Sequence, residues 1–166
     1  MEFAEIKNLL IAKFGETSVS KENVGPLQSS LTVNRNNLLE ILAELQQNDT
    51  FYFDTLSCIT GIDNGPQAGT MEVIYTLYSI PFNRRLTIKV ELIRNSEGEP
   101  LPSIPSVYSI WRTANWHERE IFDLLGIHFE GHPDLRRILL PSDWEGHPLR
   151  KDYKLQEYYH GIKTEY

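Results

Sequence analysis

NWHEREIFDLLGIHFEGHPDLRRILLPSDWEGHPLRKDY, residues 115–153, is the stretch around which the chain is organised. Four of the five histidines and two of the three tryptophans lie in it. Its first part predicts a helix over 115–125, with Asn115 as N-cap, Glu118 completing a capping box and Gly126 as the left-handed stop. The residues after this helix have no regular periodicity.

The predicted helix has an apolar side and a charged side. At about 100° per residue, one side carries the apolar residues between 121 and 125, and the other carries Trp116, Arg119, Glu120 and Asp123. Arg119 and Asp123 are four residues apart, so we expect them to pair. Glu118 falls toward the apolar side, where it needs a hydrogen-bond donor, and the amides of the first helical turn are the nearest candidates.

A seven-residue pattern occurs twice after the helix. Residues 131–137, GHPDLRR, are echoed by residues 146–152, GHPLRKD, so that each copy places a Gly-His-Pro corner before a leucine and a basic pair. Proline fixes its own φ and pushes the preceding histidine toward extended geometry, which makes both corners stiff. Such segments bury little of their own side-chain surface, so we predict that they pack on the surface of something else.

The helix and the two corners together resemble a known family. ANWHEREIFDLLGIHFEGHPDLRRIL, followed by WEGHPLRKDY, resembles the signature of the thirty-kilodalton subunit of respiratory complex I, which is the C subunit of the bacterial NADH–quinone oxidoreductase. The residues that match the family motif are Glu118, Arg119, Glu120, Asp123, Gly126, Phe129, His132, Pro133, Asp134, Arg136 and Arg137. The resemblance gives none of them a catalytic role.

The resemblance implies an interaction subunit without a cofactor, in the peripheral arm of a proton-translocating NADH:quinone oxidoreductase. FMN and iron–sulfur clusters would then sit in other subunits, which pass electrons from NADH to quinone. The implied partners are the large D-type subunit of forty-nine kilodaltons, as a separate chain, and neighbouring quinone-module subunits. The implied location is the cytoplasmic side of the bacterial inner membrane, reached only through the complex. Related subunits occur in plastid-type complexes, coenzyme F420-linked dehydrogenases and membrane-bound hydrogenases, and these alternatives stay open.

The composition narrows the class of protein. With 166 residues, 40% hydrophobic content and 23% charged content, the chain is typical of one soluble globular domain. Its net charge of −7 argues against a nucleic-acid partner, because phosphate binding needs a basic face. Cys58 is the only cysteine, which excludes an internal disulfide and a self-contained iron–sulfur cluster. The N-terminus has no signal-peptide pattern, and no apolar stretch is long enough to span a bilayer.

The rest of the chain alternates between helical and strand patterns. We predict helices over 2–14 and 36–48, and strands over 27–33, 51–63, 71–80 and 84–93. Because the last three strands follow one another through short links, the expected fold class is α+β, with an antiparallel-dominated sheet and helices packed on one face. We expect an α+β domain over 1–140 and an extended, partner-binding tail over 141–166.

Catalytic and metal-binding patterns are weak. His117-Glu118 begins like a zincin motif, but residue 121 is isoleucine, so the second zinc ligand is missing. Three histidines, His128, His132 and His147, have no spacing that forces them together. The carboxylates between 118 and 123 can in principle supply an acid/base pair, so a free-standing hydrolase is the second hypothesis. No G-x-G-x-x-G occurs, so dinucleotide and flavin binding have no basis in the sequence.

Tryptophan, tyrosine and arginine are enriched in the hot spots of protein interfaces, and the stretch around the corners is rich in them. We therefore predict a partner interface made of Trp116, Arg119, Glu120, Asp123, His132, Asp134, Arg136, Arg137, Trp144, His147, Arg150, Lys151, Asp152 and Tyr153. The tail has too few apolar residues to order itself, so we expect it to be mobile alone and ordered on the partner.

Overall fold

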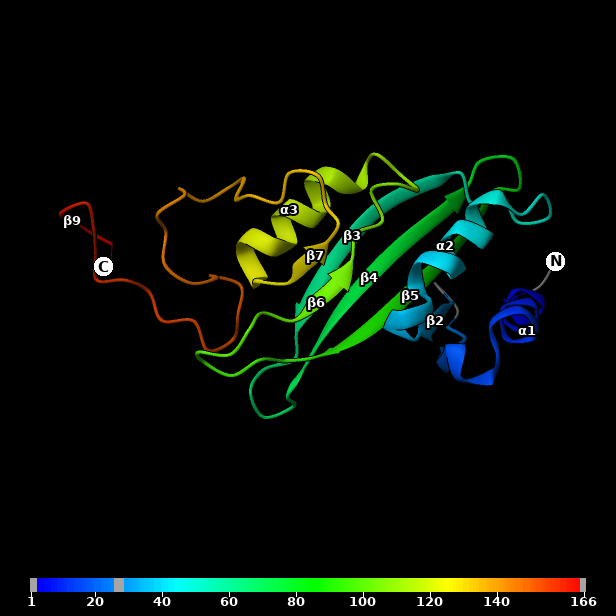
Figure 1. The fold of residues 1–166 in the computed structure, drawn as a ribbon, viewed down its shortest axis with the longest axis horizontal. Helices are drawn as coiled ribbons and strands as arrows, with labels where there is room; N and C mark the ends of the chain where they lie inside the picture. Colours follow the sequence, from blue (N-terminus) through cyan, green and yellow to red (C-terminus); the bar gives the residue numbers. More distant parts are fainter. Residues whose placement is uncertain (1–2, 26–28, 165–166) are drawn as a thin grey trace.

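A computed structural model describes residues 3–25 and 29–164. Its main element is a five-stranded sheet in the order β1-β2-β5-β4-β3, shown in Figure 1. The strands are β1 (Val19–Asn23), β2 (Ser30–Val33), β3 (Thr55–Asp63), β4 (Thr70–Ser79) and β5 (Arg84–Ile93). Within this sheet, as far as the residues are described, only β2 and β5 pair in parallel, and the other neighbours are antiparallel. The predicted α+β class with an antiparallel-dominated sheet is confirmed.

In the described part of the chain, three α-helices and two small ladders accompany this sheet. The helices are α1 (Phe3–Phe14), α2 (Leu38–Gln47) and α3 (Ala114–Leu125). Two short 3-10 turns, η1 (Glu16–Ser18) and η2 (Arg35–Asn37), precede β1 and α2. A parallel ladder joins β6 (Ser103–Pro105) to β7 (His128–Glu130), and β8 (Tyr158–Tyr159) pairs with β9 (Ile162–Lys163). Helices α2 and α3 lie on the same face of the sheet, as predicted (Figure 1).

Strict alternation in the two central strands places the core on that face. In β4, Met71, Val73, Tyr75 and Leu77 are fully buried, while most residues between them are half-buried on the other face. Side chains of successive strand residues point to opposite faces, so this pattern leaves one face of the sheet for the helices. The apolar stripe of α2 covers this core with Leu38, Ile41, Leu42 and Leu45, at helical spacing.

Several predicted boundaries need correction. The strand expected over 51–63 begins only at Thr55, because Phe51 and Phe53 turn into the core directly after α2. Residues 27 and 28 of the strand expected over 27–33 lie outside the described residues, and the strand begins at Ser30. Strand β1 was not predicted, because its sequence VSKEN is polar and mostly exposed at the sheet edge.

Helix α3 packs against β3 at a glycine. A methyl group on Gly61 would come within 2.4 Å of Leu125 Cδ1 and 3.1 Å of Ile121 Cγ2. Both of these side chains are buried, so the helix approaches the strand as closely as it does only because residue 61 has no side chain.

This contact predicts that Gly61→Val destabilises the protein by about 1–3 kcal/mol, because overpacking forces α3 away from the sheet. Thr60→Val is the matched control, since Thr60 is exposed and points to the other face, and it should be close to neutral. Urea unfolding of both variants measures the difference, and equal midpoints would show that the close packing carries no stability.

Candidate functional site at helix α3 and the C-terminal segment

The predicted capping of α3 is wrong. The helix begins at Ala114, with Thr113 at the N-cap and no side-chain bond there. The amides of Ala114 and Asn115 are already bonded to the carbonyls of the preceding turn, Trp111 and Arg112, so these two amides need no side-chain cap. Asn115 therefore sits inside the helix, and the capping box with Glu118 does not form.

Glu118 finds its donors elsewhere. Its carboxylate is fully buried and accepts hydrogen bonds from the Ser106 hydroxyl, at 2.6 Å, and from the amide of Val107, at 2.7 Å. Both donors belong to the turn that follows β6. The prediction that Glu118 needs a donor on the apolar side is confirmed, but the donors are not the first-turn amides.

Asp123 is also buried, against the prediction that it lies on the charged outer side and pairs with Arg119. Its Oδ2 accepts hydrogen bonds from three consecutive amides, those of residues 138–140, at 3.0, 2.8 and 2.9 Å. Its Oδ1 lies 2.7 Å from Nη1 of Arg137, which completes a buried ion pair. Burial alone raises the pKa of Asp123, but these amides and the guanidinium outweigh it and hold the pKa below its ordinary value.

Arg119 and Arg137 both bind backbone carbonyls. Arg119 donates to the carbonyls of Arg136 and Arg137, at 3.2 and 3.3 Å, and its guanidinium lies 5.9 Å from the ring centre of Trp116. Arg137 also donates through Nη2 to the carbonyls of Trp144 and residue 146. The chain from 136 to 146 is therefore fixed on α3 by both arginines.

The second Gly-His-Pro corner covers the C-terminal end of α3. His147 Nδ1 donates to the Asp123 carbonyl at 2.9 Å, and the Leu149 amide donates to the Leu124 carbonyl at 2.9 Å. Arg150 then donates to the carbonyls of Leu125 and residue 126. The last carbonyls of a helix have no partner within the helix, and a cation at that end also interacts favourably with the helix dipole.

Gly126 ends the helix in the left-handed region, with φ 67°, as predicted. A methyl group on it would come within 2.4 Å of the His147 ring. The glycine is therefore required both by its backbone conformation and by the approach of the second corner.

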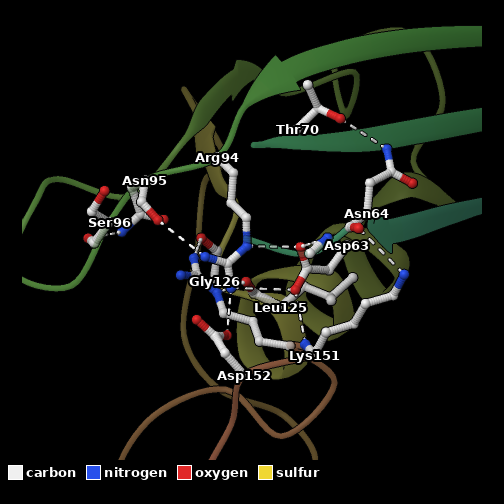
Figure 2. Close-up of polar contacts among 12 residues, drawn as sticks. Asp63, Asn64, Thr70, Arg94, Asn95, Ser96, Leu125, Gly126, Lys151 and Asp152 are labelled. Carbon is white, nitrogen blue, oxygen red and sulfur yellow. Dashed lines mark hydrogen bonds and ion pairs between the residues drawn. The ribbon is translucent and has the colours of Figure 1, made fainter. Parts of the chain in front are cut away.

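A second polar cluster joins the C-terminal segment, residues 141–164, to the end of the sheet (Figure 2). Arg94, after β5, donates to both carboxylate oxygens of Asp63, at the end of β3, and both side chains are almost fully buried. Arg94 also pairs with Asp152. The Lys151 amide donates to Asp63 at 2.8 Å, and Lys151 Nζ donates to the Asn64 carbonyl.

The same cluster perturbs the titration of its carboxylate. Burial raises the pKa of Asp63, but the Arg94 guanidinium and the amides of Lys151 and Gly65 outweigh it, so the pKa is lowered. Neither Asp63 nor Arg94 was predicted from the sequence. The only sign in the sequence was that each residue lies at the end of a predicted strand, and that both strands finish at the same end of the sheet.

Beyond Asp152 the C-terminal segment mostly contacts itself. Trp144 donates to the Tyr153 hydroxyl at 3.0 Å, and its ring lies 5.1 Å from that of Tyr159. Tyr159 in turn donates to Asp143. The predicted division at residue 140 stays a prediction, but many hydrogen bonds cross it, and they end near residue 152.

The residues predicted for the partner interface fall into three groups. Asp123 is buried by this chain's own residues. Half-buried, with contacts inside the chain, are Arg119, His132, Arg137, Trp144, His147, Arg150 and Tyr153. Exposed are Trp116, Glu120, Asp134, Arg136, Lys151 and Asp152. The largest exposed side chain among them is Trp116, at 68%.

Metal sites and membrane-spanning helices are both missing from the part of the chain over 3–25 and 29–164. No three His, Cys, Asp or Glu side chains in these ranges lie together in a way that can hold a metal ion. None of the helices in the same ranges is both long enough and apolar enough to cross a membrane.

The Asp123 contacts predict that Asp123→Asn lowers the free energy of unfolding by about 2–4 kcal/mol, because it leaves Arg137 without its counter-charge. Asp134→Asn removes an exposed partner of Arg136 and should cost less than about 0.5 kcal/mol. Urea unfolding at pH 7 compares them. Because the pKa of Asp123 is lowered in the folded state, the stabilisation by its charge should be lost as the pH falls into the acid range. If the wild type stays more stable than Asp123→Asn by the same amount in acid, the ion pair is contradicted.

Known proteins are similar to this chain in sequence. Residues 31–159 match the family model of the 30 Kd subunit of respiratory-chain NADH dehydrogenase. The C subunit of NADH-quinone oxidoreductase from Chloroherpeton thalassium is 44% identical over 93% of the chain and 62% of that protein's length. One of the C subunits of the same enzyme from Rhizobium meliloti is 42% identical over 90% of the chain and 80% of its own length.

A solved structure has the same fold at lower identity. It is the membrane-bound sulfane sulfur reductase, an archaeal respiratory membrane complex, one chain of which is 22% identical with a TM-score of 0.73. The superposition covers 92% of this chain and 85% of that one. The chain spans about three fifths of the Chloroherpeton protein, and the family model matches most of the chain's own length. This chain therefore belongs to the family of the 30 Kd subunit of respiratory-chain NADH dehydrogenase.

Proposed function

We propose that this chain is the C subunit of an NADH:quinone oxidoreductase and acts as a non-catalytic interaction subunit of its peripheral arm. Family membership supports the complex, and the geometry of α3 supports the role. The observation that carries the role is that both buried acids of α3 serve as hydrogen-bond acceptors within the chain. An acid/base pair needs access to a substrate, and neither carboxylate has it.

The electron path of the proposed complex lies in other subunits. They hold FMN and iron–sulfur clusters and pass electrons from NADH to quinone, while this chain carries no redox cofactor of its own. A cluster needs about four thiolates, and Cys58 is the only cysteine. The proposed partners are the large D-type subunit of forty-nine kilodaltons and neighbouring quinone-module subunits, on the cytoplasmic side of the membrane.

Related complexes are the second candidate. The observation that favours them is that one chain of the sulfane sulfur reductase, which is an archaeal respiratory membrane complex, has a similar fold. A free-standing hydrolase is not favoured, because Glu118 and Asp123 are buried and Glu120 stands alone on the exposed side.

The proposed contact surface is the outer side of α3 and the first corner. The Arg119 guanidinium lies 5.9 Å from the ring centre of Trp116, and its Nε and Nη2 donate to backbone carbonyls, so the exposed indole has a neighbour that is itself held in place. Arg136 follows the first corner, and its side chain is 73% exposed while paired with Asp134. An exposed tryptophan near an exposed arginine has the composition of an interface hot spot.

We predict that Trp116→Ala reduces recovery of the neighbouring subunits at least tenfold when the tagged chain is purified from native membranes, while the melting temperature of the isolated protein stays unchanged. Removing a hot-spot tryptophan costs about 2 kcal/mol of binding or more, and an exposed one contributes little to folding. Mass spectrometry identifies and counts the recovered subunits.

The matched control is Ile80→Ala, which removes another exposed apolar side chain, 63% exposed, in the turn between β4 and β5. Full recovery with both variants would show that the outer side of α3 is not the interface. Recovery of the large D-type subunit with the wild type identifies the partner, whereas a hydrolase would purify alone.

A further inference from the structure

The Glu118 carboxylate is buried without a counter-charge. It is fully buried, and its two hydrogen-bond donors, Ser106 and the amide of Val107, are neutral. No lysine or arginine within the described ranges forms an ion pair with it that the structure records. The other buried carboxylates differ, since Asp63 has Arg94 and Asp123 has Arg137.

His132 of the first corner is the nearest titratable group, with Nε2 3.9 Å from Glu118 Oε2. The Asp134 amide donates to its Nδ1 at 3.0 Å, so Nδ1 carries a lone pair and the ring proton is on Nε2. Nε2 faces the Asn115 carbonyl at 3.3 Å. Burial and the Arg119 charge lower the His132 pKa and outweigh the raising effects of the Asn115 carbonyl and Asp134, so the neutral ring is favoured at pH 7 and does not balance Glu118.

A third polar group reaches this region from the sheet. The Tyr75 hydroxyl, on β4, is buried without a hydrogen-bond partner in the described structure. Burial raises the pKa of Tyr75, and the negative charge of Glu118 raises it further. The remaining groups that pack here are Tyr108, against the His132 ring, and Arg119 and Asp134 on the outer side.

We propose that Glu118, with Ser106, Val107 and His132, forms a buried proton-binding site, and that the domain folds around the neutral carboxylic acid. The proton is the ligand, bound on one carboxyl oxygen. Ser106 Oγ already accepts from the Tyr108 amide, and its second lone pair can then accept from the acid, while the Val107 amide keeps its acceptor. Loss of the proton leaves an unbalanced charge where Ser106, α3 and the first corner meet.

The site lies where three segments of the fold are joined. Ser106 directly follows β6, and its amide donates to the Glu130 carbonyl at the end of β7. His132 comes two residues after β7 and is bonded to α3 through Asn115. Charging Glu118 therefore weakens the contact between the β6–β7 ladder and α3, on which the first corner is mounted.

The direction of the pH effect follows from the pKa. Burial raises the pKa of Glu118 to about 7, against the lowering effect of the bonds from Ser106 and Val107. Between pH 4.5, its ordinary value, and pH 7, the folded chain holds a proton that the unfolded chain has released. The stabilisation of the folded state by the Glu118 proton is therefore fully present below pH 4.5 and is lost as the pH rises from there through 7.

Glu118→Gln tests the site, because glutamine resembles the protonated acid and does not titrate. Urea unfolding from pH 3.5 to 8 gives the folding constants of both proteins. Relative to Glu118→Gln, wild-type folding should weaken by up to about 300-fold across this range, which is the effect of a pKa difference of about 2.5. Glu120→Gln, on the exposed side of the same helix, is the control, and its folding constant should stay in a fixed ratio to that of the wild type.

A direct readout uses the wild-type chain. Carbon-13 NMR of the Glu118 carboxyl should show a midpoint near pH 7, and Ser106→Ala should move it higher, because the Ser106 bond favours the charged form. A midpoint at the ordinary value, or a wild-type to Glu118→Gln ratio that does not change with pH, overturns the proposal. If Glu118→Gln does not fold, the NMR midpoint decides alone.

Discussion

The Asp123 carboxylate accepts three consecutive amides, residues 138–140, on one oxygen and Arg137 on the other. A buried charge is costly unless it is paired and fully hydrogen-bonded, and here the groups that satisfy it all come from the chain after α3. Helix and segment therefore stabilise each other. The second corner acts in the same way, because its donors bind the carbonyls at the helix end.

The two buried acids of α3 are held in different ways. Asp123 has a guanidinium and three amides, so its pKa is lowered, whereas Glu118 has only neutral donors, and its pKa is raised to about 7. Their surroundings, rather than their position in the helix, decide which is charged. Both buried acids are therefore used inside the chain, and Trp116 is left exposed on the outer side of the helix.

Sequence periodicity predicted most of the fold and few of its long-range polar contacts. The alternation in β4 and the helical spacing in α2 are strong, so both elements lie within two residues of their expected ends. Gly126 was correctly predicted as the helix stop. Asp123 was misplaced, because periodicity places it with the outer residues and cannot show that a later segment covers it. Asp63 and Arg94 were missed, because long-range pairing leaves no local pattern.

Hydrogen exchange on the free subunit tests the central claim, that α3 itself orders the chain that follows it. The amides of residues 138–140, bonded to Asp123, and those of Leu149 and Lys151, bonded to Leu124 and Asp63, should be protected without any partner. Residues 155–157 should exchange quickly. If 138–151 exchange as fast as an unfolded chain and become protected only in the complex, the segment is ordered by its partner, and Asp123 is not its anchor.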